Sequence, residues 1–123
     1  AAVVGAPVTN LSSFYGTSSI GVRFGEIEFG GTRADALDAY REHSPLTYAH
    51  NVQTPVLLLH GEEDFGCPLE QSEQFFVALK RHGKEVEMVR FPGCSHGFVG
   101  SGHPRMREEY LSRTLAWFDR YLK

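Results

Sequence analysis

The sequence has little charge imbalance, few cysteines and no long apolar run, and each shortage excludes a class of protein. Its 12 basic residues nearly balance 15 acidic ones, for a net charge of −3. That balance gives no reason to expect nucleic acid or a membrane surface as a partner. The longest apolar run is far below the ~20 residues that cross a bilayer. The two cysteines, Cys67 and Cys94, are too few for a disulfide framework.

The length and the first residues indicate what kind of piece the chain is. Its 123 residues, 41% of them hydrophobic, suffice for one modest domain. The chain opens directly on an apolar run, residues 1–8, so we expect it to be the tail of a longer protein. No basic-then-apolar export segment precedes that run, which makes the cytoplasm the expected compartment.

A run of four large aliphatic residues, Val56 to Leu59, lies between Pro55 and Gly61. It shows no alternation, so neither face is expected to meet water, as in a central strand of a parallel sheet. An acidic cluster that ends at Asp64 follows at once. In open α/β sheets, ligands and catalytic groups collect beyond the carboxyl ends of the strands, so Asp64 stands where a functional group is expected.

Strands and helices are expected to alternate along the rest of the chain. The expected strands are residues 1–8, 56–59 and 85–91, and the expected helices are 33–43, the segment from Cys67-Pro68 to Gly83, and the segment from Pro104 onward. The segments 9–20, 25–32 and 94–103 are expected to be irregular, because they are polar or rich in glycine. The last helix is expected to bury Tyr110, Leu111, Leu115, Phe118 and Leu122.

This order predicts an α/β fold with about three parallel strands and flanking helices in three layers, αβα. The first strand is expected at one edge of the sheet. Because an apolar edge strand can pair with another chain, we expect this edge to pair with a further copy, giving a homo-oligomer, or with a missing part of the same domain.

Two loops that follow neighbouring strands carry the residues best suited to chemistry. Asp64 lies on one loop, and His96, flanked by Gly93 and Gly97, lies on the other. Adjacent parallel strands would bring the loops side by side. An aspartate that accepts from a histidine ring nitrogen fixes the tautomer and stabilises the imidazolium when the histidine acts as a base. We therefore predict Asp64 and His96 as catalytic residues.

The chain offers no convincing nucleophile. The order Ser, Asp, His of α/β-hydrolases would place the serine upstream of Asp64. The only G-x-S-x-G match contains Ser95, and we reject it, because a nucleophile elbow needs a helix directly after it and the segment that follows is expected to be a loop. The sequence therefore predicts no nucleophile in this chain.

The remaining cysteines and histidines favour ordinary roles. The spacing of Cys94 and His96 is not that of a zinc site, and further ligands are missing, so no metal is expected. Cys67 and Cys94 could also pair as a disulfide, although buried thiols are favoured. The other histidines are expected to be structural or exposed: His43, His50, His60, His82 and His103.

Several segments together resemble the carboxyl-terminal half of the catalytic domain of prolyl oligopeptidase-family serine peptidases, in particular acylaminoacyl-peptidase-like members. They are Phe14-Tyr15-Gly16-Thr17-Ser18, Ser44-Pro45-Leu46, the run from Thr54 to Asp64, Cys67-Pro68, Gln71-Ser72-Glu73-Gln74-Phe75 and the run from Pro92 to Phe98. The resemblance covers nearly the whole chain.

The resemblance implies that residues 1–123 are the carboxyl-terminal portion of an α/β-hydrolase domain, often preceded by a β-propeller. It implies Asp64 as the triad acid, His96 as the triad base, a serine on an elbow just before Ala1, and no cofactor. Many members carry arginine two residues after the triad aspartate, where this chain has Gly66, and glutamate where it has Cys94.

Three functions follow as hypotheses. The first is a fragment of a serine hydrolase that cleaves peptides or acyl-peptides, supplying the acid and base but not the serine. The second is a non-catalytic module that oligomerises through its first strand or complements a separate amino-terminal half. The third is part of an esterase or dienelactone-hydrolase-like enzyme acting on small esters. The substrate-binding residues are not identified at this stage.

Overall fold

The computed structural model describes residues 1–122 and places ten elements along them. In chain order these are β1 (Ala2–Gly5), α1 (Leu11–Thr17), α2 (Gly21–Phe29), α3 (Leu37–Glu42), the 3-10 helix η1 (Pro45–Asn51), β2 (Val56–Gly61), α4 (Glu70–Arg81), β3 (Val86–Phe91), α5 (Phe98–Ser101) and α6 (Pro104–Tyr121). Within residues 1–122, no helix is both long enough and apolar enough to cross a bilayer.

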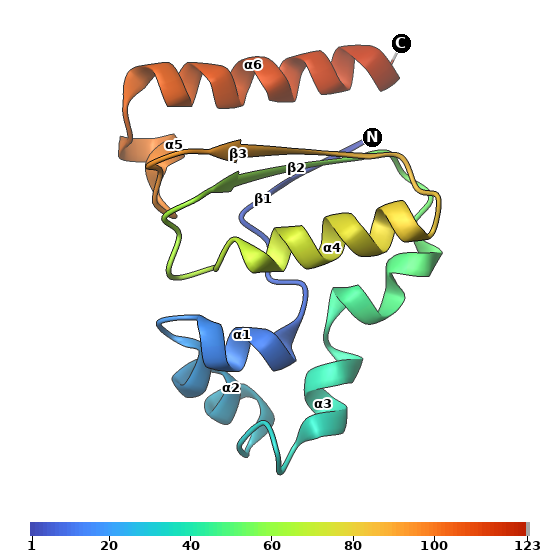
Figure 1. Ribbon diagram of the computed structural model, residues 1–123, viewed down its shortest axis with the longest axis vertical. Helices are drawn as coiled ribbons and strands as arrows, with labels where there is room; N and C mark the ends of the chain where they lie inside the picture. Colours follow the sequence, from blue (N-terminus) through green and yellow to red (C-terminus); the bar gives the residue numbers. More distant parts are fainter. Residues whose placement is uncertain (123) are drawn as a thin grey trace.

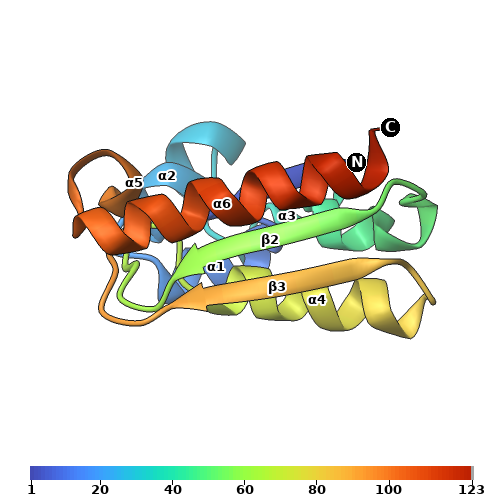
Figure 2. The same ribbon diagram turned by 90° about the horizontal axis from the view of Figure 1, so that it is seen from above.

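The three strands form one parallel sheet in the order β1-β2-β3, as predicted. Val56 pairs with Ala2 on one side and with Val86 on the other, so the register places β2 in the centre. Helix α4 covers one face of the sheet and α6 crosses the other, which gives the predicted αβα layers (Figures 1 and 2).

Alternate residues of β2 build two separate cores. Val56 and Leu58 pack on the α4 side with Phe75 and Leu79. Leu57 and Leu59 pack on the α6 side in a second cluster that includes Phe91, Cys94, Phe98 and Trp117. Every residue of β2 is buried, which confirms the reading of its uninterrupted apolar run as a strand covered on both faces.

A group of short helices, α1 to α3, lies beyond α4 (Figure 1). The prediction of irregular structure for residues 9–20 and 25–32 was wrong where α1 and α2 form. Asn10 Oδ1 caps α1 by accepting from the backbone N–H groups of Ser12 and Ser13. Gly21 and Gly25 are buried helical residues packed against Phe14 and Tyr40, so these glycines permit close helix packing and do not mark a loop.

Helix α6 forms where it was predicted, but it buries a different face. Trp117 is 3% exposed, whereas Leu111, Leu115 and Leu122 are 57%, 65% and 64% exposed. The prediction that these leucines are buried was therefore wrong for this chain. The segment 94–103 also differs from the prediction, because the four-residue helix α5 interrupts the loop.

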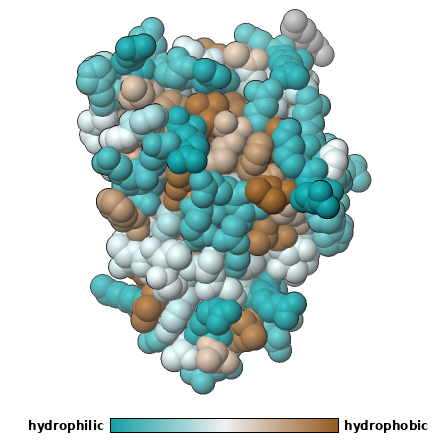
Figure 3. All heavy atoms as spheres, in the orientation of Figure 1, coloured by the Kyte–Doolittle hydropathy of each residue, from teal (hydrophilic) through white to brown (hydrophobic). Residues whose placement is uncertain are grey.

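The face of the molecule that includes β3 and α4 mixes hydrophobic residues with hydrophilic ones (Figure 3). A shallow groove there is lined by Glu73, Phe76, Val77, Met88 and Arg90. Arg90 forms ion pairs with Glu62 and Glu73. These charged side chains discourage the open edge of β3 from pairing with other strands.

Candidate active site

The turn after β2 holds the carboxylate of Asp64 in a fixed orientation. Asp64 is only 3% exposed. Its Oδ1 atom accepts from the backbone N–H groups of Gly66 (3.0 Å) and Cys67 (2.8 Å). These two bonds fix Oδ1 in place and leave Oδ2 directed toward the next loop.

The loop after β3 is joined to this turn by backbone hydrogen bonds. The Glu62 N–H donates to Phe91 O and the Glu63 N–H donates to Cys94 O, both at 3.0 Å. A side chain on Gly61 would overlap the Cys94 carbonyl oxygen, so glycine at the end of β2 allows the two loops to touch.

The contact between the loops brings Asp64 and His96 together. The sequence predicted that these two loops lie side by side. His96 Nδ1 is 2.8 Å from Asp64 Oδ2. Since a carboxylate oxygen accepts, Nδ1 carries the proton in the neutral ring and Nε2 has a free lone pair. The His96 side chain is 60% exposed, and no described residue hydrogen-bonds its Nε2. The free lone pair on His96 Nε2 can accept a proton from a group of another molecule or segment placed beside it.

A second histidine, His60, lies near the same carboxylate and was not predicted to do so. It is fully buried, and its Nε2 lies 3.6 Å from Asp64 Oδ2. Both of its nitrogens have other partners, Ser72 Oγ at 2.6 Å and the Cys67 carbonyl at 2.7 Å. His60 therefore has no nitrogen available for a substrate. A polar residue at the end of an otherwise apolar strand was the signal that could have identified it.

Comparison with known proteins identifies the family of the chain. The sequence profile of the prolyl oligopeptidase family matches residues 1–123. The chain belongs to the prolyl oligopeptidase family. Its resemblance to these serine peptidases is thereby confirmed, and its three parallel strands with flanking helices match part of an α/β-hydrolase domain.

Individual family members extend the comparison. Uncharacterized peptidase YuxL of Bacillus subtilis is 45% identical over 99% of this chain, which corresponds to 19% of that protein. The acylaminoacyl peptidase of Pyrococcus horikoshii superposes with a TM-score of 0.92 at 36% identity over 96% of this chain and 19% of its own. A puromycin hydrolase S511A mutant superposes with a TM-score of 0.74 at 32% identity over 92% of this chain and 16% of its own.

The chain therefore spans about a fifth of the length of these relatives. It corresponds to a C-terminal segment of the family's peptidase domain.

Ser95 remains a poor match to the nucleophile of this serine peptidase family. Strand β3 ends at Phe91, and Pro92 and Gly93 form a turn, so the strand does not lead directly into Ser95. The helix that follows, α5, has four residues. No hydrogen bond joins Ser95 Oγ to His96 within residues 1–122. The geometry therefore lacks the sharp strand-to-helix turn of an elbow.

The two cysteines of the chain are free thiols with raised pKa values. Cys67 and Cys94 are unpaired thiols in the described structure. Burial raises the pKa of both, and the nearby carboxylates of Asp64 and Glu63 raise them further. A raised pKa lowers the thiolate fraction at neutral pH.

Residues 1–122 contain no cluster of three or more His, Cys, Asp or Glu side chains that could hold a metal ion.

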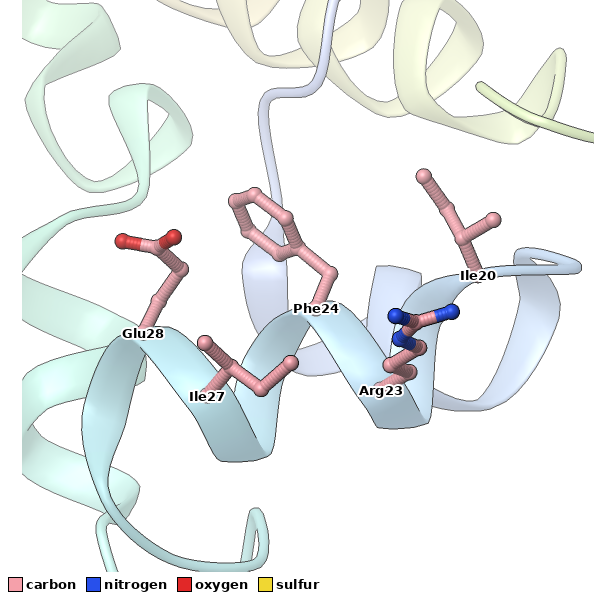
Figure 4. Close-up of a pocket in the computed structure, with 5 residues that line it drawn as sticks. All are labelled: Ile20, Arg23, Phe24, Ile27 and Glu28. Atoms are coloured by element: carbon pink, nitrogen blue, oxygen red, sulfur yellow. The ribbon is translucent and has the colours of Figure 1, made fainter.

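Helix α2, whose preceding residues contact the Asp64 turn, carries an apolar groove. It has a volume of about 300 Å³ and is lined by Ile20, Arg23, Phe24, Ile27 and Glu28 (Figure 4). The preceding residues join it to the turn, because the Ser19 N–H donates to Phe65 O (2.8 Å) and Ser18 Oγ donates to Gly66 O (2.6 Å). The groove is thus held in a fixed position relative to Asp64.

Proposed function

We propose that residues 1–123 form the carboxyl-terminal portion of a serine hydrolase domain that cleaves peptides or acyl-peptides. In this proposal the chain supplies the triad acid, Asp64, and the triad base, His96. The nucleophilic serine and its elbow lie in polypeptide outside this chain. The observation that carries the proposal is the 2.8 Å contact between Asp64 Oδ2 and His96 Nδ1, on a His96 side chain that is 60% exposed and whose Nε2 no described residue hydrogen-bonds.

The chemistry follows from the state of each nitrogen. His96 Nε2 takes the serine proton as the oxygen attacks the carbonyl, and then gives that proton to the leaving amine. Asp64 holds the ring in the Nδ1–H tautomer and stabilises the imidazolium that forms. In this proposal the groove on α2, which is joined to the Asp64 turn through Ser18 and Ser19, receives an apolar group of a peptide or acyl-peptide substrate.

A fluorophosphonate, which reacts with activated serines, tests the assignment by intact mass. The chain alone is expected to form no adduct. When the upstream part of its own domain is supplied, labelling is expected to appear, to be lost in His96→Asn and to persist in His50→Asn, a change at an exposed histidine outside the site. An adduct on the chain alone that Ser95→Ala abolishes would reject this assignment of roles.

A second candidate function is a non-catalytic complementing or oligomerising module, and one surface favours it. Among the described residues, β1 pairs only with β2, so one of its edges is open. Helix α6 adds the exposed leucines at 111 and 115. At 100° per residue, these lie away from Arg113 and Arg120, which line the pocket over β3. Sedimentation tests the homo-oligomer: a chain that stays monomeric at high concentration would reject pairing between copies.

A further inference from the structure

His60 is a polar residue at a position where an apolar one would be expected. It is the second-last residue of β2, between Leu59 and Gly61, and its side chain is fully buried. Burying a polar ring costs free energy unless its nitrogens are hydrogen-bonded. Both nitrogens of His60 have partners, so the histidine is part of a satisfied network.

The partners determine which nitrogen carries the proton. The Cys67 carbonyl can only accept, so His60 Nε2 carries the hydrogen and donates across 2.7 Å. The other nitrogen, Nδ1, then accepts from the Ser72 hydroxyl across 2.6 Å. In this tautomer the ring is neutral, and no uncompensated charge is buried in the sheet.

The same residue, Cys67, connects His60 to the carboxylate. Its carbonyl is held by His60, and its N–H donates to Asp64 Oδ1 at 2.8 Å. Two hydrogen bonds therefore close the segment 60–67. One joins His60 to the Cys67 carbonyl, and the other joins the Cys67 N–H to Asp64. His60 Nε2 also lies 3.6 Å from Asp64 Oδ2, so the positive end of its N–H dipole is close to the carboxylate charge.

We infer that His60 is a positioning residue that holds the Asp64 carboxylate toward His96 through the carbonyl of Cys67. This inference rests on the proposed function, since it assigns a role to His60 only if Asp64 and His96 work together. Ser72 acts one step further away, by keeping Nδ1 of His60 unprotonated. Without His60, the turn that carries Cys67 would lose its anchor, and Oδ2 would no longer face His96 Nδ1.

Two substitutions separate this role from simple space filling. In His60→Gln, the amide nitrogen can occupy the place of Nε2 and donate to the Cys67 carbonyl. In His60→Asn, the shorter amide lies near the Nδ1 position and cannot reach that carbonyl. The full chain is labelled with 15N-histidine, and long-range 1H–15N correlation spectra above neutral pH report which ring nitrogen of each histidine is protonated. Circular dichroism confirms that each variant is folded.

His96 is expected as the Nδ1–H tautomer in the wild type and in His60→Gln, and as a mixture of tautomers in folded His60→Asn. If folded His60→Asn keeps the Nδ1–H tautomer, or if folded His60→Gln loses it, the positioning role is wrong. If His60→Asn does not fold, the wild type decides: His60 as the Nε2–H tautomer supports the inference, and His60 as the Nδ1–H tautomer overturns it.

Asp64→Asn serves as the control that distinguishes the two proposals. Its amide replaces the accepting Oδ2, so His96 is expected to lose the Nδ1–H preference. If wild-type His96 already lacks that preference, the proposed Asp64–His96 pair itself fails, whatever His60 does. If wild type and Asp64→Asn behave as expected while folded His60→Asn matches wild type, only the role of His60 fails.

Discussion

Gly61→Ala is expected to separate the two loops that carry Asp64 and His96. A Cβ at residue 61 would overlap the carbonyl oxygen of Cys94 and would lie 2.9 Å from its carbonyl carbon and 3.1 Å from Ser95 O. All of these atoms are backbone, so no side-chain rotation relieves the contact. The loop after β3 must move, and the 3.0 Å bond from Glu63 N–H to Cys94 O must lengthen or break.

The cost follows from these two changes. Overpacking a well-filled site costs about 1–3 kcal/mol, and losing one hydrogen bond costs about 1 kcal/mol. Together they lower the free energy of unfolding by roughly 2–4 kcal/mol. With an m-value of about 2 kcal/mol/M, the urea midpoint is expected to fall by roughly 1–2 M. Urea titrations followed by circular dichroism measure this shift.

Gly66→Ala provides a matched control in the same turn. A Cβ there would have Asp64 Oδ1 as its nearest neighbour at 3.5 Å, an ordinary van der Waals contact. Its free energy of unfolding is expected to change by about 0.5 kcal/mol or less. If Gly61→Ala unfolds at the same urea concentration as Gly66→Ala, the two loops are not in the contact described above and the reasoning is refuted.

Three further predictions concern thiols, pH and surface. Since burial and then Asp64 raise the pKa of Cys67, iodoacetamide is expected to alkylate it more slowly at pH 8 than a free thiol, and faster in Asp64→Asn; equal rates by mass spectrometry would contradict this. Burial raises the pKa of several acids that are neutral when protonated, namely Cys67, Cys94, Tyr40 and Tyr110. The folded state therefore keeps these protons longer, so stability is full below their unfolded pKa values of about 8.5–10 and falls as pH rises above them; urea titrations at rising pH that show no loss would contradict it. Leu115→Lys is expected to leave the free energy of unfolding within about 0.5 kcal/mol of wild type, because that side chain is 65% exposed, and to weaken any self-association seen by sedimentation.

The strands could be predicted because their pattern reports burial directly. In β2, four aliphatic residues between Pro55 and Gly61 allow only a short element with both faces covered. Neighbouring parallel strands then place their following loops together. The contact between Asp64 and His96 could be expected from this topology before any distance was known.

The helical details could not be predicted in the same way. The glycines of 25–32 indicate a loop by composition, but Gly25 is helical, and it is glycine because the Tyr40 ring leaves no room for a side chain. In α6 the sequence contains two apolar rows, and periodicity alone does not say which one meets the sheet. The position of the sheet decides, and it buries the row with Trp117 and leaves the row with Leu115 exposed.

The two histidines near Asp64 show what spacing can reveal and what only geometry can. His96 lies between glycines on a loop, so its sequence context predicts an exposed, functional side chain. His60 lies inside a strand, so its context predicts a structural one, and full burial agrees. The two rings nevertheless approach the same oxygen, at 2.8 and 3.6 Å. What separates their roles is the other nitrogen: in His60 it is occupied by Ser72, and in His96 no described residue occupies it. Under the proposed function, only His96 exchanges a proton with the substrate, and His60, whose two nitrogens both have partners, orients the carboxylate.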